Sequence, residues 1–180
     1  MTYIGNSPTD KAHQNQVDII DKPRSTGSIL KPFLYCQGFD EGHITPYSLI
    51  PDVPTHYKGY TPQNYAQSYD GAVIAKKSLA QSLNIPAVRL LEKVELNNFY
   101  QKLKSIELST LKKPASHYGL SLILGGAEAK LWDLNKAYSK MSWQLGQLNP
   151  KEIPKFGIRL SAKKYKFKPN YSSGSIYLTF

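Results

Sequence analysis

Apolar residues recur every three or four positions along much of the chain, a spacing typical of amphipathic helices. This spacing predicts helices over 28–39, 73–80, 86–94, 97–103 and 131–141. The first begins close to Ser28, because Pro32 is tolerated only in the first turn of a helix. The same spacing predicts that Phe33 and Cys36 lie on the buried face of this helix.

The segments between these helices are irregular or short. Residues 42–70 contain four prolines and many tyrosines, so we expect a long loop there rather than an array of strands. Alternating residues between 156 and 167 predict two short strands. Ser172 is expected to cap a last apolar run, Ile176 to Phe180. The pattern therefore predicts a mostly helical protein with a few short strands.

The composition suits one globular domain: 180 residues, 41% hydrophobic and 20% charged. No stretch approaches the roughly 18–20 apolar residues of a membrane span, and the N-terminus lacks the layout of a signal peptide. Composition alone therefore predicts a soluble, cytoplasmic chain. A lone cysteine, Cys36, excludes a disulfide framework and a cysteine-based zinc site, and the four histidines lack metal-ligand spacing. We expect neither a metal nor another cofactor.

The positive charge is concentrated near the end of the chain. The formal net charge is +10, and residues 151–180 hold seven basic residues against one acidic residue. Only three of the 23 basic residues are arginine, the side chain that nucleic-acid readers favour for bidentate contacts, so no nucleic-acid partner is expected. Two interpretations of the segment 151–180 stay open: a solvated tail, or a contact with an anionic polymer or membrane.

Two short motifs carry candidate chemistry. In Ser28-x-x-Lys31, a serine near a helix start shares a face with a lysine one turn later. The lysine amine can take the hydroxyl proton if burial lowers its pKa. In Ser82-x-Asn84, the hydroxyl can relay a proton and the amide can hydrogen-bond a substrate. Taken alone, each motif also fits a simpler interpretation, a capped helix with a surface lysine or an ordinary turn.

Longer segments around these motifs resemble one family. The stretch Pro23–Tyr35 is similar to the active-serine segment of class A penicillin-binding proteins, and Ser82–Leu91 resembles a later segment of the same transpeptidase domain. Three further segments resemble that domain in the same order: 52–54, 60–65 and 117–128. The last of them points to the penicillin-binding protein 1C branch of the family. The resemblance extends from Tyr3 to Met141.

This resemblance implies a D,D-transpeptidase that cross-links peptidoglycan. By the family's mechanism, Ser28 would attack the penultimate D-alanine carbonyl of a stem peptide, with Lys31 as its base. Ser82 would relay protons to the leaving group, and Asn84 would orient the substrate amide. The implied partners are the peptidoglycan stem peptide and β-lactams, which acylate the same serine. The implied fold is α+β: the helical part of a penicillin-binding-protein/β-lactamase-like domain, with remnants of the antiparallel sheet.

One part of the family's site is missing from the sequence. By resemblance, residues 42–70 and Gly125–Gly126 would frame the cleft, and the Ser28 backbone N–H would be one oxyanion donor. No Lys-Thr-Gly or Lys-Ser-Gly triplet occurs. In the family that triplet lies on a strand beside the cleft and binds the substrate carboxylate, and the residue after it completes the oxyanion hole. We therefore expect the chain to be inactive or crippled alone.

The domain organisation follows from the same comparison. We expect residues 1–180 to be a partial transpeptidase domain, with a helical core over 1–150 and a basic segment over 151–180. Two alternatives stay open: half of a two-chain transpeptidase whose second chain supplies the missing strands, and a non-enzymatic binding module that uses the basic segment. The family is periplasmic and anchored in the inner membrane, which conflicts with the cytoplasmic expectation from composition.

Overall fold

The computed structural model describes residues 18–57, 59–148 and 170–180. In chain order its elements are β1 (Arg24–Ser25), α1 (Lys31–Asp40), β2 (Leu49–Asp52), β3 (Gly71–Ile74), α2 (Ala75–Ala80), α3 (Asn84–Val94), α4 (Leu96–Ser105), α5 (Ala115–Tyr118), the 3-10 helix η2 (Gly119–Leu124), β4 (Glu128–Ala129), α6 (Leu131–Leu148) and α7 (Ser173–Thr179). Within these residues the fold is mostly helical with two small antiparallel sheets, which confirms the α+β expectation. The strands expected between 156 and 167 lie outside the described residues.

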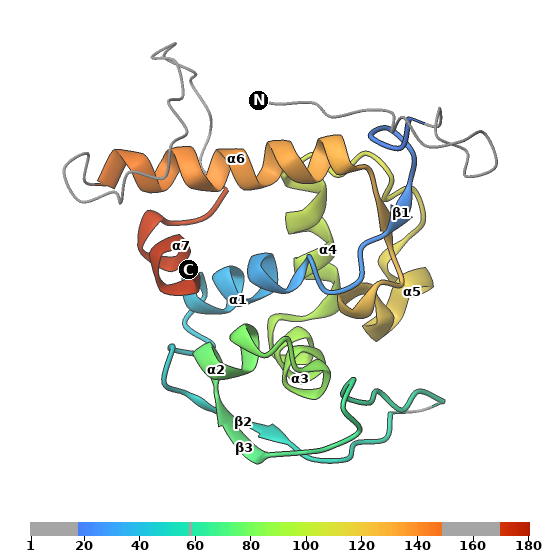
Figure 1. The fold of residues 1–180 in the computed structure, drawn as a ribbon, viewed down its shortest axis with the longest axis vertical. Coiled ribbons are helices and arrows are strands. Elements are labelled where there is room, and N and C mark those ends of the chain that lie inside the picture. The colour runs from blue at the N-terminus through green and yellow to red at the C-terminus, as the bar shows by residue number, and fades with distance from the viewer. Residues whose placement is uncertain (1–17, 58, 149–169) are drawn as a thin grey trace, which may run out of the picture.

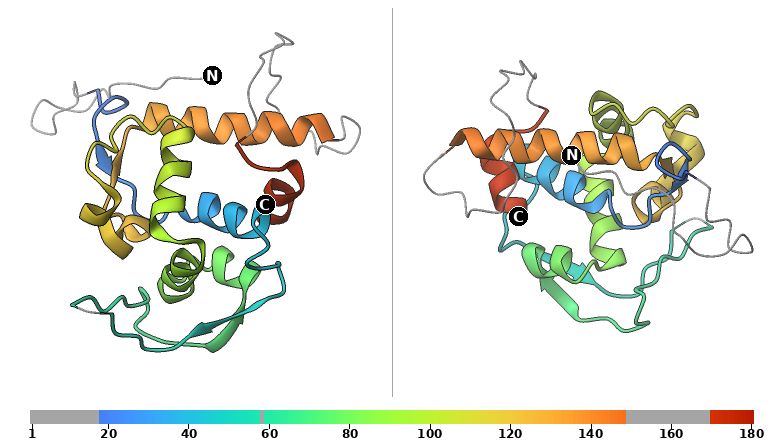
Figure 2. Two further views of the ribbon diagram at one scale, coloured as in Figure 1. Left: turned by 180° about the vertical axis from the view of Figure 1, so that it is seen from behind. Right: turned by 45° about the horizontal axis from the view of Figure 1, so that its top comes forward.

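Helix α1 lies at the centre of the fold. Figure 1 shows α6 on one side of it, and α3 with the β2–β3 hairpin on the other. The view from behind shows the same order of layers (Figure 2). Helix α7, from the far end of the chain, packs against both α1 and α6. The segment that carries the first motif is therefore covered from several directions.

The core is built around α1 because apolar side chains surround that helix. Phe33, Leu34 and Cys36 are fully buried, which confirms the prediction that Cys36 is a small core residue. Gly38 lets α1 and α3 approach closely, since a Cβ there would lie 3.0 Å from Cδ1 of Leu90. Central position and close packing fix the axis of α1, and with it the start of the helix.

The start of α1 corrects the sequence prediction. The helix begins at Lys31, three residues after Ser28, and Pro32 occupies its second position. Ser28 lies in the preceding turn, where Lys31 N donates to Ser28 O at 3.0 Å. Gly27 precedes it with φ +51°, a conformation that favours glycine. A serine before a helix suits a turn as well as a cap, so local sequence did not distinguish the two.

The expectation for residues 42–70 was wrong in part. Strand β2 lies within this range and pairs with β3 in register, from Leu49 opposite Ile74 to Asp52 opposite Gly71. Residues 73–74, predicted as helical, belong to β3, and α2 begins only at Ala75. A two-stranded ladder tolerates a proline such as Pro51. The prolines therefore led to the prediction of a loop where the chain forms a β-hairpin.

Other helix predictions held, with shifted boundaries. Leu90, Leu91 and Val94 of α3 are buried, as predicted from their spacing. Helix α4 begins at Leu96, one residue before the predicted start, and ends at Ser105, two residues after the predicted end. Ser172 caps α7 as predicted, because its side chain accepts a hydrogen bond from Ser175 N at 3.0 Å.

We expect Leu91→Ala to lower the free energy of unfolding by about 2–5 kcal/mol, because Leu91 is fully buried in the main core. Leu131→Ala is the matched control: Leu131 is 52% exposed, and its truncation should change stability by about 0.5 kcal/mol or less. Urea denaturation followed by circular dichroism measures both. Equal losses in the two variants would contradict the placement of Leu91 in the core.

Candidate active site

Hydrogen bonds to the segment before α6 hold the turn that carries Ser28 in place. The Ser25 hydroxyl donates to Gly125 O at 2.8 Å, and Thr26 N donates to Ala127 O at 3.0 Å. Strands β1 and β4 continue this contact as a two-residue ladder. Ser28 itself is exposed, and its hydroxyl makes no hydrogen bond to a described side chain. The fold therefore presents a free hydroxyl on a fixed turn.

Ile29, the residue after Ser28, is hydrogen-bonded to a side chain of α6. The Tyr138 hydroxyl donates to Ile29 O at 2.7 Å. Burial raises the pKa of Tyr138 to about 12, so this phenol keeps its proton and remains a donor at any physiological pH. Contacts on both sides of Ser28 thus hold the backbone of the turn that carries it.

Lys31 is the buried cation of the site. It is only 1% exposed, and its Nζ contacts Ser82 O at 2.6 Å, Asn84 Oδ1 at 2.7 Å and Ser82 Oγ at 3.2 Å. Burial lowers the pKa of Lys31 from 10.5 to about 8. Two motifs that lie more than fifty residues apart in the sequence therefore meet at one amine.

The three contacts of Lys31 differ chemically. Two of the partners, Ser82 O and Asn84 Oδ1, are carbonyl oxygens that can only accept, and they make the shorter bonds. The Ser82 hydroxyl, at the longer distance, can accept from a charged amine or donate to a neutral one. A proton that reaches Lys31 can therefore pass on through Ser82 while the carbonyls hold the amine in place.

Ser82 and Asn84 occupy a constrained turn between α2 and α3. Ser82 has φ +54°, a left-handed conformation that is uncommon for a residue with a side chain. Asn84 begins α3, and its Nδ2 donates to Gln63 O at 2.7 Å. With Nδ2 bound to Gln63, Oδ1 of Asn84 points to Lys31. The turn therefore directs the Ser82 hydroxyl and the amide oxygen of Asn84 at the same Lys31 amine.

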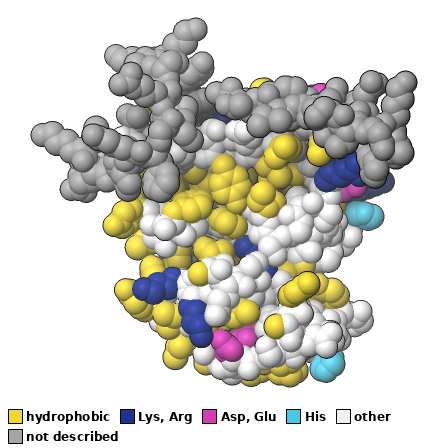
Figure 3. All heavy atoms as spheres, in the orientation of Figure 1, with side chains coloured by type: hydrophobic (Ala, Val, Ile, Leu, Met, Phe, Trp, Pro, Cys, Tyr) yellow, Lys and Arg dark blue, Asp and Glu magenta, His cyan; other side chains and the backbone are white. Residues whose placement is uncertain are grey.

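An open apolar groove lies beside the Ser28 turn. It has a volume of about 340 Å³ and is lined by Ile29 and by residues of α6, among them Leu131, Leu134 and Tyr138. Figure 3 shows hydrophobic side chains gathered on this face of the molecule. The groove can hold the apolar part of a ligand, and it reaches the Ser28 turn at Ile29.

The four residues named from the sequence thus lie in three neighbouring segments. Lys31, Ser82 and Asn84 are in direct contact, and Ser28 lies on the turn just before Lys31. Sequence reasoning did not single out Asn64, which binds the start of α3. It lies in the segment 60–65, whose resemblance to the transpeptidase domain was the available signal.

Comparison with known proteins decides the family. Residues 2–148 match the family described as penicillin binding protein transpeptidase domain. The chain belongs to this family. Penicillin-binding protein 1C of Escherichia coli K12 is 41% identical over 130 residues, which are 72% of this chain and 17% of that protein. Penicillin-binding protein 1F of Bacillus subtilis 168 is 35% identical over 127 residues, 69% of this chain and 16% of that protein.

Solved structures of transpeptidases share the fold. Penicillin-binding protein 1A of Haemophilus influenzae superposes with a TM-score of 0.60 at 24% identity, over 71% of this chain and 20% of that one. The transpeptidase domain of Burkholderia pseudomallei penicillin-binding protein 3 gives 0.67 at 18% identity, over 93% and 54%. PonA1 of Mycobacterium tuberculosis, solved with penicillin V, gives 0.63 at 18% identity, over 72% and 38%.

The sequence matches cover only a small part of each curated relative, so they establish the family of this chain but not its activity. The chain spans about a sixth of the length of the two curated relatives, at 17% and 16%. In the part of the chain that the structure describes, no helix combines the length and apolar character needed to cross a bilayer. The comparisons therefore establish the family and the fold. The activity of this chain has to be inferred from the residues of its own candidate site.

Proposed function

We propose that this chain carries the acyl-transfer site of a penicillin-binding D,D-transpeptidase of peptidoglycan synthesis. The observation that carries this proposal is the buried amine of Lys31, held by Ser82 and Asn84 one turn after an exposed Ser28. A desolvated lysine amine can serve as the base for a serine hydroxyl that precedes it by three residues on a fixed turn. Membership of the transpeptidase family supports the same chemistry.

In the proposed mechanism, Ser28 Oγ attacks the penultimate D-alanine carbonyl of a stem peptide and passes its proton to neutral Lys31. The proton moves through the Ser82 hydroxyl to the leaving nitrogen, and the terminal D-alanine departs as the carbonyl carbon forms an ester with Ser28. An amine of a second stem then attacks the ester, forms the cross-link and returns the proton to Ser28. The amide of Asn84 orients the substrate. Peptidoglycan stems are cross-linked outside the inner membrane, so this function places the site at the periplasmic face.

A β-lactam takes the first half of the same path. Its ring carbonyl is attacked by Ser28, the ring nitrogen receives the proton through Ser82, and the opened lactam stays attached as an ester. Because the sequence holds no Lys-Thr-Gly triplet, one oxyanion donor is absent. Loss of one such donor typically slows acyl transfer by ~10²–10³. We propose that the chain alone acylates slowly, and that a second chain supplying the missing strands raises the rate.

A labelling experiment tests the proposal. The purified chain is incubated with a fluorescent penicillin and run on a denaturing gel, and mass spectrometry locates the adduct. We expect one adduct per chain on the peptide that contains Ser28, absent from Ser28→Ala and retained in Ser105→Ala, which removes an exposed serine of α4. A folded chain that takes up no label, or label that persists in Ser28→Ala, would refute the proposed function.

The alternative of a binding module that acts through the basic segment is less well supported. Residues 149–169, which contain all seven of that segment's basic residues, lie outside the described residues. The family match covers residues 2–148 and thus the candidate site rather than that segment. The comparisons therefore favour acyl transfer.

A further inference from the structure

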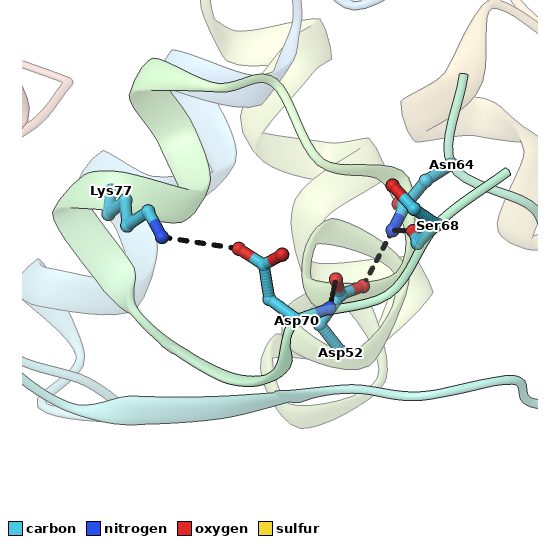
Figure 4. A network of polar contacts seen from close by, with 5 residues as sticks. All are labelled: Asp52, Asn64, Ser68, Asp70 and Lys77. Atoms are coloured by element: carbon cyan, nitrogen blue, oxygen red, sulfur yellow. Dashed lines mark hydrogen bonds and ion pairs between the residues drawn. The ribbon is translucent and has the colours of Figure 1, made fainter. Parts of the chain in front are cut away.

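A buried polar network lies behind the Ser82–Asn84 turn. Asp52 ends β2 and Asn64 lies in the loop that follows, and they are only 1% and 3% exposed. Asn64 Nδ2 donates to Asp52 Oδ1 at 2.8 Å and to Ser68 O at 3.0 Å (Figure 4). Asp52 Oδ2 accepts from Asp70 N at 2.9 Å. Each oxygen of the Asp52 carboxylate therefore has a donor, which is what burial of such a group requires.

The other end of Asn64 binds the start of α3. Its Oδ1 accepts from Asn84 N at 2.9 Å and from Ile85 N at 3.3 Å, the first two N–H groups of the helix. The residue before the helix is Leu83, which has no side-chain acceptor to cap it. Asn64 thus caps α3 from twenty residues away, and the capped residue Asn84 is the one that contacts Lys31.

Asp52 determines which way the Asn64 amide points. A carboxylate offers only acceptors, so it binds the NH₂ side of the amide and leaves Oδ1 facing α3. A flipped amide would place its NH₂ group against the two backbone N–H donors of Asn84 and Ile85 and its oxygen against the carboxylate. Both contacts would then be repulsive in a buried site, where unsatisfied polar groups cost most.

We propose that Asp52 and Asn64 are positioning residues of the acyl-transfer site. They hold the first turn of α3 so that Asn84 Oδ1 and Ser82 O stay in contact with the Lys31 amine. The effect on rate rests on the proposed function, whereas the capping of α3 by an oriented amide does not. Neither residue touches Lys31; both act through Asn84.

The test uses two matched Asp→Asn changes. Asp52→Asn leaves one acceptor oxygen where the carboxylate had two, so Asn64 Nδ2 and Asp70 N compete for it and the Asn64 amide loses its fixed orientation. We expect amide hydrogen exchange at Asn84 and Ile85 to rise at least about ten-fold while the amide of Leu91, deep in α3, is unaffected. Penicillin labelling should slow about ten-fold. Asp70→Asn is the control: its carboxylate pairs with Lys77 at 3.2 Å near the surface, and its backbone N–H still donates to Asp52.

A double variant supplies the rescue. In Asp52→Asn/Asn64→Asp the carboxylate at position 64 can accept from both N–H groups of α3 and from the new amide at position 52. That amide's oxygen can still accept from Asp70 N, and only the bond to Ser68 O is lost. We expect exchange at Asn84 and Ile85 and the labelling rate to return towards those of the unmodified chain.

Three results would overturn the positioning role: unchanged exchange in Asp52→Asn, exchange that rises equally at Leu91, or a double variant no better than the single one. Hydrogen exchange is measured without penicillin. If the unmodified chain takes up no label, the proposed function fails while the exchange measurements still decide whether Asp52 and Asn64 position α3.

Discussion

Lys31→Met should abolish most penicillin labelling, with a fall in rate of about 10³, within the range of general-base effects. Burial lowers the pKa of Lys31 to about 8, so at pH 7 about one amine in ten is neutral, against roughly one in 3,000 at the ordinary value of 10.5. Methionine matches the length of the buried stem but carries no base. Lys77→Met, which removes an exposed lysine, is the control and should label normally.

The pH dependence gives an independent check on the same lysine. Labelling by the unmodified chain should rise up to about pH 8 and then level off, because only the neutral amine accepts a proton. Between about pH 8 and 10.5 the unfolded chain binds a proton on Lys31 that the folded chain does not, so stability should rise with pH across this window. Lys31→Met should lose both slopes. A rate that is flat from pH 6 to 9, or a variant that labels like the unmodified chain, would exclude Lys31 as the base.

Gly125→Ala should slow labelling by about 10², because it displaces the turn that carries Ser28. Gly125 has φ +99°, and a Cβ there would lie 2.9 Å from Gly27 N and 2.7 Å from Ser25 Oγ. Backbone cannot yield as a flexible side chain does, so the turn must move. A displacement of about 1 Å at a reacting group typically costs about 10² in rate.

The control for this glycine is Gly174→Ala in α7, where a Cβ would find its nearest neighbour, Ser172 Oγ, at 3.9 Å. It should fold and label normally. Ser25→Ala removes the hydrogen bond to Gly125 O without a clash and should slow labelling in the same direction but less. Circular dichroism shows whether each variant is folded. Normal labelling by folded Gly125→Ala would show that the contact does not position Ser28.

Much of the helical fold could be predicted from the sequence, because the buried face of a helix requires apolar residues every three or four positions. Leu90, Leu91 and Val94 recur at helical intervals and are buried together. The β2–β3 hairpin could not be predicted in this way, since four-residue strands that include Pro51 carry too short an alternating pattern. The start of α1 was misplaced because Ser28 and Pro32 suit both a helix and the turn before it.

The sequence could name candidate site residues but could not give their arrangement. The resemblance named Ser28, Lys31, Ser82 and Asn84, while no spacing rule brings positions fifty residues apart together. The burial of Lys31, and so its lowered pKa, depends on that tertiary contact. The role of Asn64 could not be predicted for the same reason, because its partner Asp52 lies on a strand that the spacing of apolar residues did not indicate.

The pairing of β1 with β4 also sets an order of assembly. Ser25 and Glu128 are partners in this ladder although 103 residues separate them, so a long loop must close before the pair can form. A nascent chain that has been synthesised only as far as residue 120 already contains both motifs but lacks the segment that fixes the Ser28 turn. The Ser28 turn therefore reaches its final position late, when synthesis has passed Ala129 and the two ends of this loop have met.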